Sequence, residues 1–295
     1  MLKIYKEVIV RLVMTLLVKD EIDIIEHNLS YHFSQGVDHA IVIDNGSADG
    51  TRELLDKLEC GRLTVVDEPG QDYQQGIWMT RAAHMARNDF GADWVLNNDA
   101  DEFWVPRMGN LKAVIERTQA DILYCRRTNL IFPWDTSDDT PWVERCVFSV
   151  QTPISIPRLS NPLTDPLPCP YFYLALPDKV LTSTQGLVEI SQGNHSAKYD
   201  RPIREETAEI DVLHFPVRSK KQFRSKIRNG GRAYARNSEL TKGIGWHIRR
   251  QFQFIQEHGL NAAIADALPN VSALEKDLKS GIVVEHLFLK EQLRM

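Results

Sequence analysis

The first 130 residues alternate between short apolar runs and segments in which apolar side chains recur at helical spacing. The apolar runs are residues 8–18, 39–44, 62–68, 92–98 and 121–127, and the helical segments between them are residues 20–33, 51–59, 75–89 and 111–119. Strands joined by helices form crossover units, so their sheet is largely parallel and is covered on both faces. The pattern predicts an α/β fold with a Rossmann-like, mostly parallel sheet flanked by helices.

The second half of the chain has a different character. Nine of the 14 prolines lie between Pro133 and Pro177, which excludes long helices there and indicates loops and edge strands. Later strands are expected in residues 186–197 and 209–216, and from Ser219 onward the chain is helical and basic.

We therefore expect two parts. Residues 1–217 form a nucleotide-sugar-binding, catalytic domain whose proline-rich residues 130–180 receive the acceptor. Residues 218–295 form a helical C-terminal region packed on that domain.

Composition excludes several classes of protein. The net charge of -5 gives no general attraction to nucleic acid. Four scattered cysteines without a CxxC pair argue against a disulfide framework and fit a reducing, cytoplasmic compartment. Residues 8–18 are too few to cross a bilayer, Arg11 interrupts them, and no cleavage site follows. We expect neither a transmembrane segment nor a signal peptide, while peripheral membrane contact and the oligomeric state stay open.

Polar and acidic residues follow the predicted strands. Lys19 follows the first, Asp44 the second, Asp67 and Glu68 the third, and Asp99 and Asp101 of "NNDADEFW" the fourth. The carboxyl ends of parallel strands meet at one sheet edge, where such folds bind ligands. Neighbouring carboxylates repel each other, and a divalent cation commonly offsets that repulsion. This edge is therefore the candidate site.

The glycine pattern limits how a nucleotide could bind there. Neither GxGxxG nor GxxxxGK[ST] is present, so a dinucleotide site and a P-loop are both unsupported. A nucleotide can still bind where an acid holds the base or ribose and a metal holds the phosphates. Asp44 is placed for the first task, and Asp99 and Asp101 for the second.

These motifs resemble family 2 glycosyltransferases. "VIDNGSADGT" is similar to the turn after their second strand, and "NNDADEF" to their DXD motif. The form "DADEF", together with the later "GNH" and "HFPVRS", resembles a non-processive branch. The resemblance covers residues 12–232. It implies a GT-A fold, a nucleoside-diphosphate-sugar donor, with UDP expected, and Mn²⁺ or Mg²⁺.

The resemblance also implies roles for single residues. Asp44 would contact the nucleoside, Asp99 the ribose or a metal-bound water, and Asp101 the metal. A late histidine would be a further metal ligand; His214 ends a strand and is favoured over His195 of "GNHS". Lys19 and Arg81 would meet the base or the phosphates.

Some features depart from the family pattern. Asn45 replaces the second acid of the usual "DDGS", and "QxxRW" is absent, which argues against a polymerising synthase. No "ED" pair supplies a catalytic base. The candidates in the proline-rich segment are Asp135, Asp138, Asp139, Glu144 and Asp165, and the sequence does not choose among them. The basic run of residues 220–236 reads as a solvated helix face rather than a diphosphate clamp by Arg218, Lys226 or Arg228.

The sequence thus predicts a metal-dependent glycosyltransferase acting on a carbohydrate, lipid-linked or protein acceptor. One alternative is a sugar nucleotidyltransferase, but "VKDEID" lacks the glycine-rich loop that would bind a triphosphate. The other is a non-catalytic carbohydrate-binding or scaffold protein of the same fold. The sugar, the acceptor and the stereochemical outcome stay open.

Overall fold

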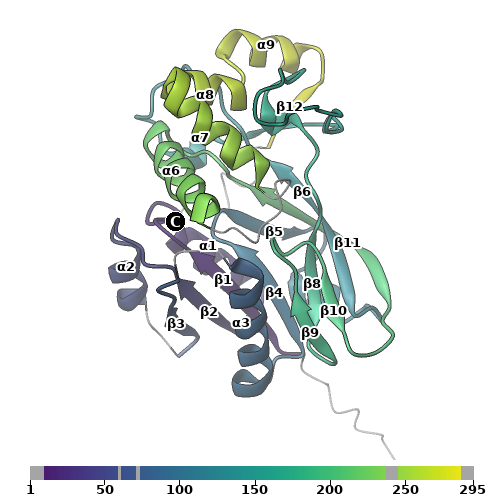
Figure 1. Ribbon diagram of the computed structural model, residues 1–295. Helices are drawn as coiled ribbons and strands as arrows, with labels where there is room; N and C mark the ends of the chain where they lie inside the picture. Colours follow the sequence, from purple (N-terminus) through teal and green to yellow (C-terminus); the bar gives the residue numbers. More distant parts are fainter. Residues whose placement is uncertain (1–9, 59–60, 71–73, 237–244, 287–295) are drawn as a thin grey trace, which may run out of the picture.

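An eight-stranded sheet with the order β3-β2-β1-β4-β8-β6-β11-β5 forms the centre of the computed structural model, which describes residues 10–58, 61–70, 74–236 and 245–286 (Figure 1). The strands are β1 Leu12–Val18, β2 His39–Asp44, β3 Leu63–Asp67, β4 Trp94–Asp99, β5 Glu102–Pro106, β6 Ile122–Asn129, β7 Phe148–Val150, β8 Lys179–Ser183, β9 Leu187–Ile190, β10 Ala197–Tyr199, β11 Glu205–His214 and β12 Val283–Glu285. The helices are α1 Ile25–Ser34, α2 Thr51–Leu58, α3 Gln75–Phe90, α4 Leu111–Ile115, α5 Trp142–Arg145, the 3-10 helix η1 Tyr171–Tyr173, α6 Lys220–Arg236, α7 Trp246–His258, α8 Leu260–Ala267 and α9 Val271–Lys279.

The strands β3, β2, β1 and β4 pair in parallel, as the alternation of strands and helices predicts. Strand β1 is apolar on both faces because helices cover both. Met14 and Leu16 pack in one core cluster with α1 and α2, while Val13 packs in another with α3. The register places Val18 beside Asp44, and Leu17 beside Asp99, so these three strands end at one edge of the sheet.

The other half of the sheet is mixed. Strand β8 is antiparallel to both of its neighbours, β4 and β6, and β5 is antiparallel to β11, whereas β6 and β11 are parallel. Only Ala100 and Asp101 separate β4 from β5, so no crossover helix can join them as parallel neighbours. The α/β class with flanking helices is confirmed, and the run of parallel pairs from β3 to β4 ends where β4 meets the antiparallel strand β8.

The helical C-terminal region is present and shares a core with the proline-rich segment. Phe223 and Ile227 of α6 and Ile264 of α8 pack in a cluster with Phe132 and Trp142. Strand β7 of the proline-rich segment pairs antiparallel with β12 near the end of the described chain. Among the described residues, no helix has both the length and the apolar character needed to cross a bilayer.

Candidate active site

A cavity of about 710 Å³ lies where the carboxyl ends of β1 and β4 face α6, η1 and α7. Five of the residues predicted for the site line it: Lys19, Asp99, Asp101, His195 and His214. They come from strand ends and from a turn that are far apart in the sequence. The structure therefore brings these five residues to one cavity.

A buried polar network that includes Asn28 of α1 supports the turn between β4 and β5. The Asn28 side-chain amide of α1 donates to the carbonyl oxygens of Ala100 and Glu102, each at 2.9 Å. Its Oδ1 accepts from Asn98 Nδ2 at 3.1 Å, and Trp104 Nε1 donates to Asn98 Oδ1 at 2.9 Å. Satisfied buried networks of this kind fix a single conformation. The backbone that carries Asp99 and Asp101 is thereby held in place on α1.

Asp101 lies between β11 and α6. Its carboxylate forms an ion pair with the Lys226 ammonium, and its Oδ2 lies 3.3 Å from His214 Nε2. Burial acts to raise the pKa of Asp101, but the Lys226 ammonium lowers it, and the pKa lies well below the ordinary value. Asp101 is therefore ionised at neutral pH, although its side chain is only 5% exposed.

His214 is oriented by its other ring nitrogen. Asn129 Nδ2 donates to the carbonyl of Phe172 at 3.0 Å, so Asn129 Oδ1 accepts from His214 Nδ1 at 2.8 Å. Burial lowers the pKa of His214, although Asp101 acts to raise it. A neutral ring that donates from Nδ1 to Asn129 presents an unprotonated Nε2 to Asp101. Two acceptor atoms face each other, an arrangement that a positive charge between them stabilises. Metal-binding histidines are commonly oriented by just such a contact at the second nitrogen.

Asp99 has different partners, from β8, α3 and the turn that contains "GNH". Its carboxylate forms an ion pair with Lys179, and its Oδ1 accepts from Gln75 Nε2 at 2.9 Å and from Asn194 Nδ2 at 3.3 Å. Burial acts to raise the pKa of Asp99, but the Lys179 ammonium lowers it below the ordinary value. Lys179 is itself fully buried and also pairs with Glu102 at 3.1 Å. Asp99 is thus part of a closed network of ion pairs and hydrogen bonds.

His195 lies on the Asp99 side of the cavity. Its Nδ1 donates to the carbonyl of Asp178 at 2.7 Å. Burial, aided by Lys179 and Arg127, lowers its pKa to about 4, so the ring is neutral. Within the described residues, the structure shows no carboxylate in contact with its Nε2. Of the two candidate histidines, His214 is the one whose Nε2 contacts a carboxylate of the DXD motif.

The residues predicted to bind the nucleoside are only partly at the cavity. Lys19 lines it and donates to the carbonyl of Asn45 at 2.6 Å. Asp44 is buried, and its Oδ1 accepts from the hydroxyl and backbone amide of Ser47, at 2.5 and 3.2 Å. That contact shapes the turn before α2, and Asn45, rather than Asp44, lines the cavity.

Arg81 lies away from the cavity. Its guanidinium forms an ion pair with Glu68 at 2.7 Å, and its side chain is 54% exposed. The helix α3 presents it toward the end of β3 rather than toward Asp99.

None of the five proline-segment acids lines the cavity described above. Asp135 accepts from the amide of Val271 at 2.8 Å, Asp138 pairs with Arg145 at 2.8 Å, and Asp139 accepts from Ser137. Asp165 accepts from the amides of Ser160 and Asn161, and Glu144 lies on α5. These contacts stabilise loops and helix ends, so the structure does not bring these acids together with the DXD motif.

Lys179 and Gln75 are among the cavity residues that the sequence did not predict. Lys179 begins an apolar strand, so its only signal is a charged residue at the edge of a buried run. Gln75 is the first residue of α3, and nothing in its surroundings marks it. Of the three candidates for a clamp, Lys226 reaches the cavity, Arg218 is buried against Glu21 and Asp23, and Arg228 is exposed.

The residues present fit a divalent cation shared with a phosphate ligand. Within the described part of the chain, no three His, Cys, Asp or Glu side chains form a group able to hold a metal alone. Asp101 and His214 nevertheless converge. Mg²⁺ is usually bound through one or two protein carboxylates together with substrate phosphates, and Mn²⁺ accepts oxygen and imidazole ligands. The donor set therefore suits a cation that arrives with a diphosphate.

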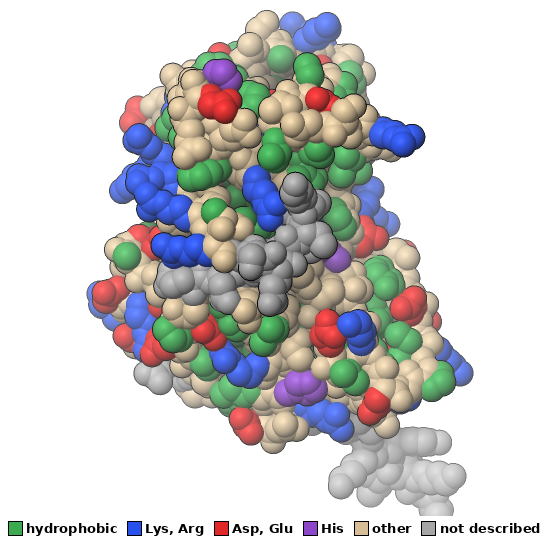
Figure 2. Space-filling model, viewed as in Figure 1, with side chains coloured by type: hydrophobic (Ala, Val, Ile, Leu, Met, Phe, Trp, Pro, Cys, Tyr) green, Lys and Arg blue, Asp and Glu red, His purple; other side chains and the backbone are tan. Residues whose placement is uncertain are grey.

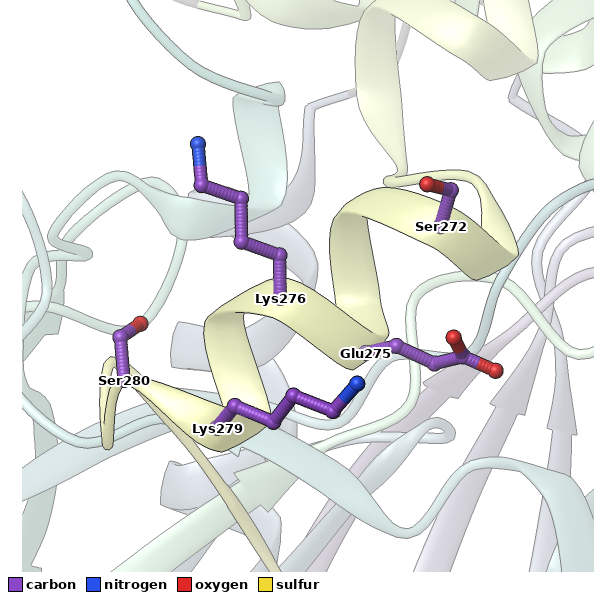
Figure 3. A pocket seen from close by; sticks show the side chains of 5 residues that line it. All are labelled: Ser272, Glu275, Lys276, Lys279 and Ser280. Carbon is purple, nitrogen blue, oxygen red and sulfur yellow. The ribbon is translucent and has the colours of Figure 1, made fainter.

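A second depression, of about 500 Å³, lies on α9. Figure 3 shows that its side chains, Ser272, Glu275, Lys276, Lys279 and Ser280, come from one helix and diverge from it. In Figure 1, α9 lies at the top, away from the ends of β1 and β4. It has no part in the cavity at the sheet edge.

Comparison with known proteins bears on the segment that contains the acids. Residues 21–143 match a family model described as glycosyl transferase family 2. A search among curated proteins finds no match.

Two solved structures show a weak similarity. The crystal structure of S. aureus TarS aligns at 13% identity with a TM-score of 0.37, over 85% of this chain and 44% of TarS. HddC from Yersinia pseudotuberculosis aligns at 13% identity with a TM-score of 0.28, over 41% of this chain and 58% of HddC. Both scores are too low to support an argument, and the chain spans less than two thirds of either protein. The family match covers the segment that contains Asp44, Asp99 and Asp101, and it shows that residues 21–143 are similar to glycosyltransferase family 2, a family of glycosyltransferase enzymes.

Proposed function

We propose that the protein is a metal-dependent glycosyltransferase that moves a sugar from a nucleoside-diphosphate sugar, with UDP as the nucleotide, to an acceptor. The observation that supports this most is the facing pair of Asp101 Oδ2 and His214 Nε2, 3.3 Å apart, in a cavity at the carboxyl edge of the sheet. An ionised carboxylate and a neutral imidazole aimed at one space suit a cation that also binds the donor.

The proposed roles follow from the surroundings of each residue. Asp101 and His214 hold Mn²⁺ or Mg²⁺, which when bound supplies positive charge to the leaving diphosphate. Asp99 faces the ribose side, where its side chain is 26% exposed. Lys19, in the loop after β1, contacts Asn45 and holds the nucleoside end, and Asp44 shapes the turn before α2 through Ser47. His195 lies on the Asp99 side of the cavity and is not proposed as a metal ligand.

The acceptor is proposed to enter opposite the sheet edge. Tyr171 and Phe172 of the proline-rich segment and Trp246 of α7 line that side of the cavity. The proposal keeps a catalytic domain of residues 1–217, an acceptor region of residues 130–180 and a C-terminal region of residues 218–295. The acceptor is a carbohydrate, lipid-linked or protein group. None of the five proline-segment acids is proposed as the catalytic base, because none lines this cavity.

A reducing, cytoplasmic location is part of the proposal. Cys125, Cys146 and Cys169 are free thiols, and burial raises the pKa of each of them. Such thiols suit a compartment that keeps cysteines reduced.

The test is calorimetric titration with a panel of nucleoside diphosphates, with and without Mn²⁺. We expect one nucleotide, UDP, to bind only with Mn²⁺, and Asp101→Asn to abolish that binding. Asp67→Asn is the matched control, because Asp67 also ends a parallel strand but is 76% exposed and pairs with Arg52. Binding to no nucleotide under either condition would remove the transferase proposal and favour a non-catalytic protein. Equal binding by Asp101→Asn would remove the metal site.

A further inference from the structure

The Asp101 carboxylate already has a cation of the protein's own, the Lys226 ammonium. A lysine ammonium ordinarily carries its charge at neutral pH. The ion pair therefore already offsets the charge of Asp101 without a metal.

The position of Lys226 is set by the helix that carries it. Phe223 and Ile227, on either side of it in α6, are buried in the C-terminal core. Asn229 Nδ2 of the same helix donates to Asp20 Oδ2 at 2.6 Å, which ties α6 to the loop after β1. The exposed residues Lys221, Arg224 and Arg228 face outward, and Figure 2 shows basic side chains gathered over this part of the surface. Lys226 alone among these four basic residues lines the cavity.

Lys226 also differs from the lysine at the other DXD acid. Lys179 is fully buried and has two carboxylate partners, Asp99 and Glu102. Lys226 is 30% exposed and has one ion-pair partner among the described residues, Asp101. A lysine ammonium is a point charge on a flexible four-carbon stem, so a partly exposed one can change partner by side-chain rotation. Lys226 has that freedom, and Lys179 does not.

An ammonium and a divalent cation that need the same carboxylate oxygen repel each other. We propose that Lys226 competes with the divalent cation for Asp101, and that once displaced it binds the diphosphate of the donor. The proposal rests on the metal and donor site of the proposed function and adds a second task for α6.

The competition makes metal and donor binding interdependent. Metal alone must displace Lys226 and leave its charge beside another cation. Metal with a diphosphate gives the displaced ammonium a new anionic partner in the same cavity. By linkage, the diphosphate strengthens metal binding, and metal strengthens diphosphate binding by the same factor. Lys226 thus acts as a donor-binding residue that also disfavours metal binding without the donor.

The test measures free Mn²⁺ by electron paramagnetic resonance, with Mn²⁺ alone and with UDP. In wild type we expect weak binding of Mn²⁺ alone and binding strengthened at least about tenfold by UDP. Lys226→Met should bind Mn²⁺ alone about tenfold more tightly than wild type, and UDP should strengthen it much less. Lys221→Met, on the exposed face of the same helix, should match wild type.

Two further variants keep the test decisive. Lys226→Gln replaces Lys226→Met if the latter does not fold, and Lys226→Arg, which keeps the charge, should behave as wild type. Wild type that binds Mn²⁺ and UDP while Lys226→Met shows unchanged affinity for Mn²⁺ alone overturns the competition but leaves the proposed function intact. Absence of Mn²⁺ binding in all variants, with and without UDP, overturns both.

Discussion

Asp99 and Asp101 are two residues apart in the chain, yet their carboxylates lie in different surroundings. Asp99 belongs to a network of groups from β8, α3 and the turn before β10, with a fully buried lysine at its centre. Asp101 faces a neutral histidine and a partly exposed lysine from the C-terminal helix α6. Two residues spaced like Asp99 and Asp101 would share one face of a continuous strand. Strand β4 ends at Asp99, however, and Asp101 lies in the turn before β5, so one motif places two acids in two environments. From this difference we infer that Asp99 mainly positions the other groups of the site and that Asp101 binds the divalent cation.

The largest expected effect comes from exchanging each acid for its amide. Asp101→Asn should lower Mn²⁺-dependent UDP release from UDP-sugars on the order of 10²–10³-fold, because it removes the charge that fixes the cation. Asp99→Asn should lower it about tenfold, since its contacts position other groups. Initial rates across a panel of UDP-sugars compare the two variants. Equal losses would abolish the distinction between them.

Replacing the buried Lys179 should lower the free energy of unfolding rather than weaken the binding of metal or nucleotide. Lys179→Met leaves Asp99 without its ion pair and Glu102 with only Arg127, at 3.1 Å. Losing one partner of a buried pair lowers the free energy of unfolding by about 3 kcal/mol, measured by urea denaturation. The control is Lys198→Met. Lys198 pairs with Glu189 on the surface, where the two side chains are 73% and 48% exposed. This variant should change the free energy of unfolding by about 0.5 kcal/mol or less. If Lys179→Met falls in the range of the control, the Asp99 network is not a stabilising one.

The two histidines sharpen the comparison further. His214→Ala should weaken Mn²⁺ binding in the presence of UDP by about tenfold, because Nε2 faces Asp101. His195→Ala should leave Mn²⁺ affinity within about twofold of wild type, since its Nδ1 is bound to Asp178 and its Nε2 faces no DXD acid. Mn²⁺ titrations of both variants decide this, and a larger loss in His195→Ala would move the metal to the Asp99 side.

The last effect, which is absent at neutral pH, concerns His32, which contacts the network that supports both acids. His32 is fully buried, donates from Nδ1 to the Asn28 carbonyl at 2.8 Å, and accepts from the Trp104 amide at Nε2. Burial lowers its pKa to about 4. Between that value and the ordinary pKa of about 6.5, the unfolded chain binds a proton that the folded chain does not.

Stability should therefore fall as the pH drops from about 6.5 to about 4, with a slope from His32 of at most about 1.4 kcal/mol per pH unit. No contribution from His32 is expected above about pH 6.5. Urea denaturation across this range should give a flatter profile for His32→Gln than for wild type. An identical profile would show that His32 is not the group that titrates.

Sequence reasoning predicted the parallel half of the sheet because its signal is local. Each apolar run and each helical repeat in residues 12–99 is set by side chains within one element, and the acids at the strand ends share an edge once the strands are parallel. It missed the antiparallel strands β8 and β5. Their pairing depends on which distant strand is free to accept them, and a single sequence does not encode that choice locally.

The sequence by itself determined the kind of protein: an α/β fold, an acidic sheet edge and a family motif that places Asp99 and Asp101 at the end of β4. Only the tertiary structure decided which groups meet them. Lys179 lies 80 positions from Asp99, and Lys226 lies 125 positions from Asp101. The structure likewise placed His214, rather than His195, against Asp101, and left Arg81 and the five proline-segment acids away from the cavity. The physical reason is that a strand end fixes where a side chain emerges, whereas its partners depend on how β11, β8 and α6 pack around it.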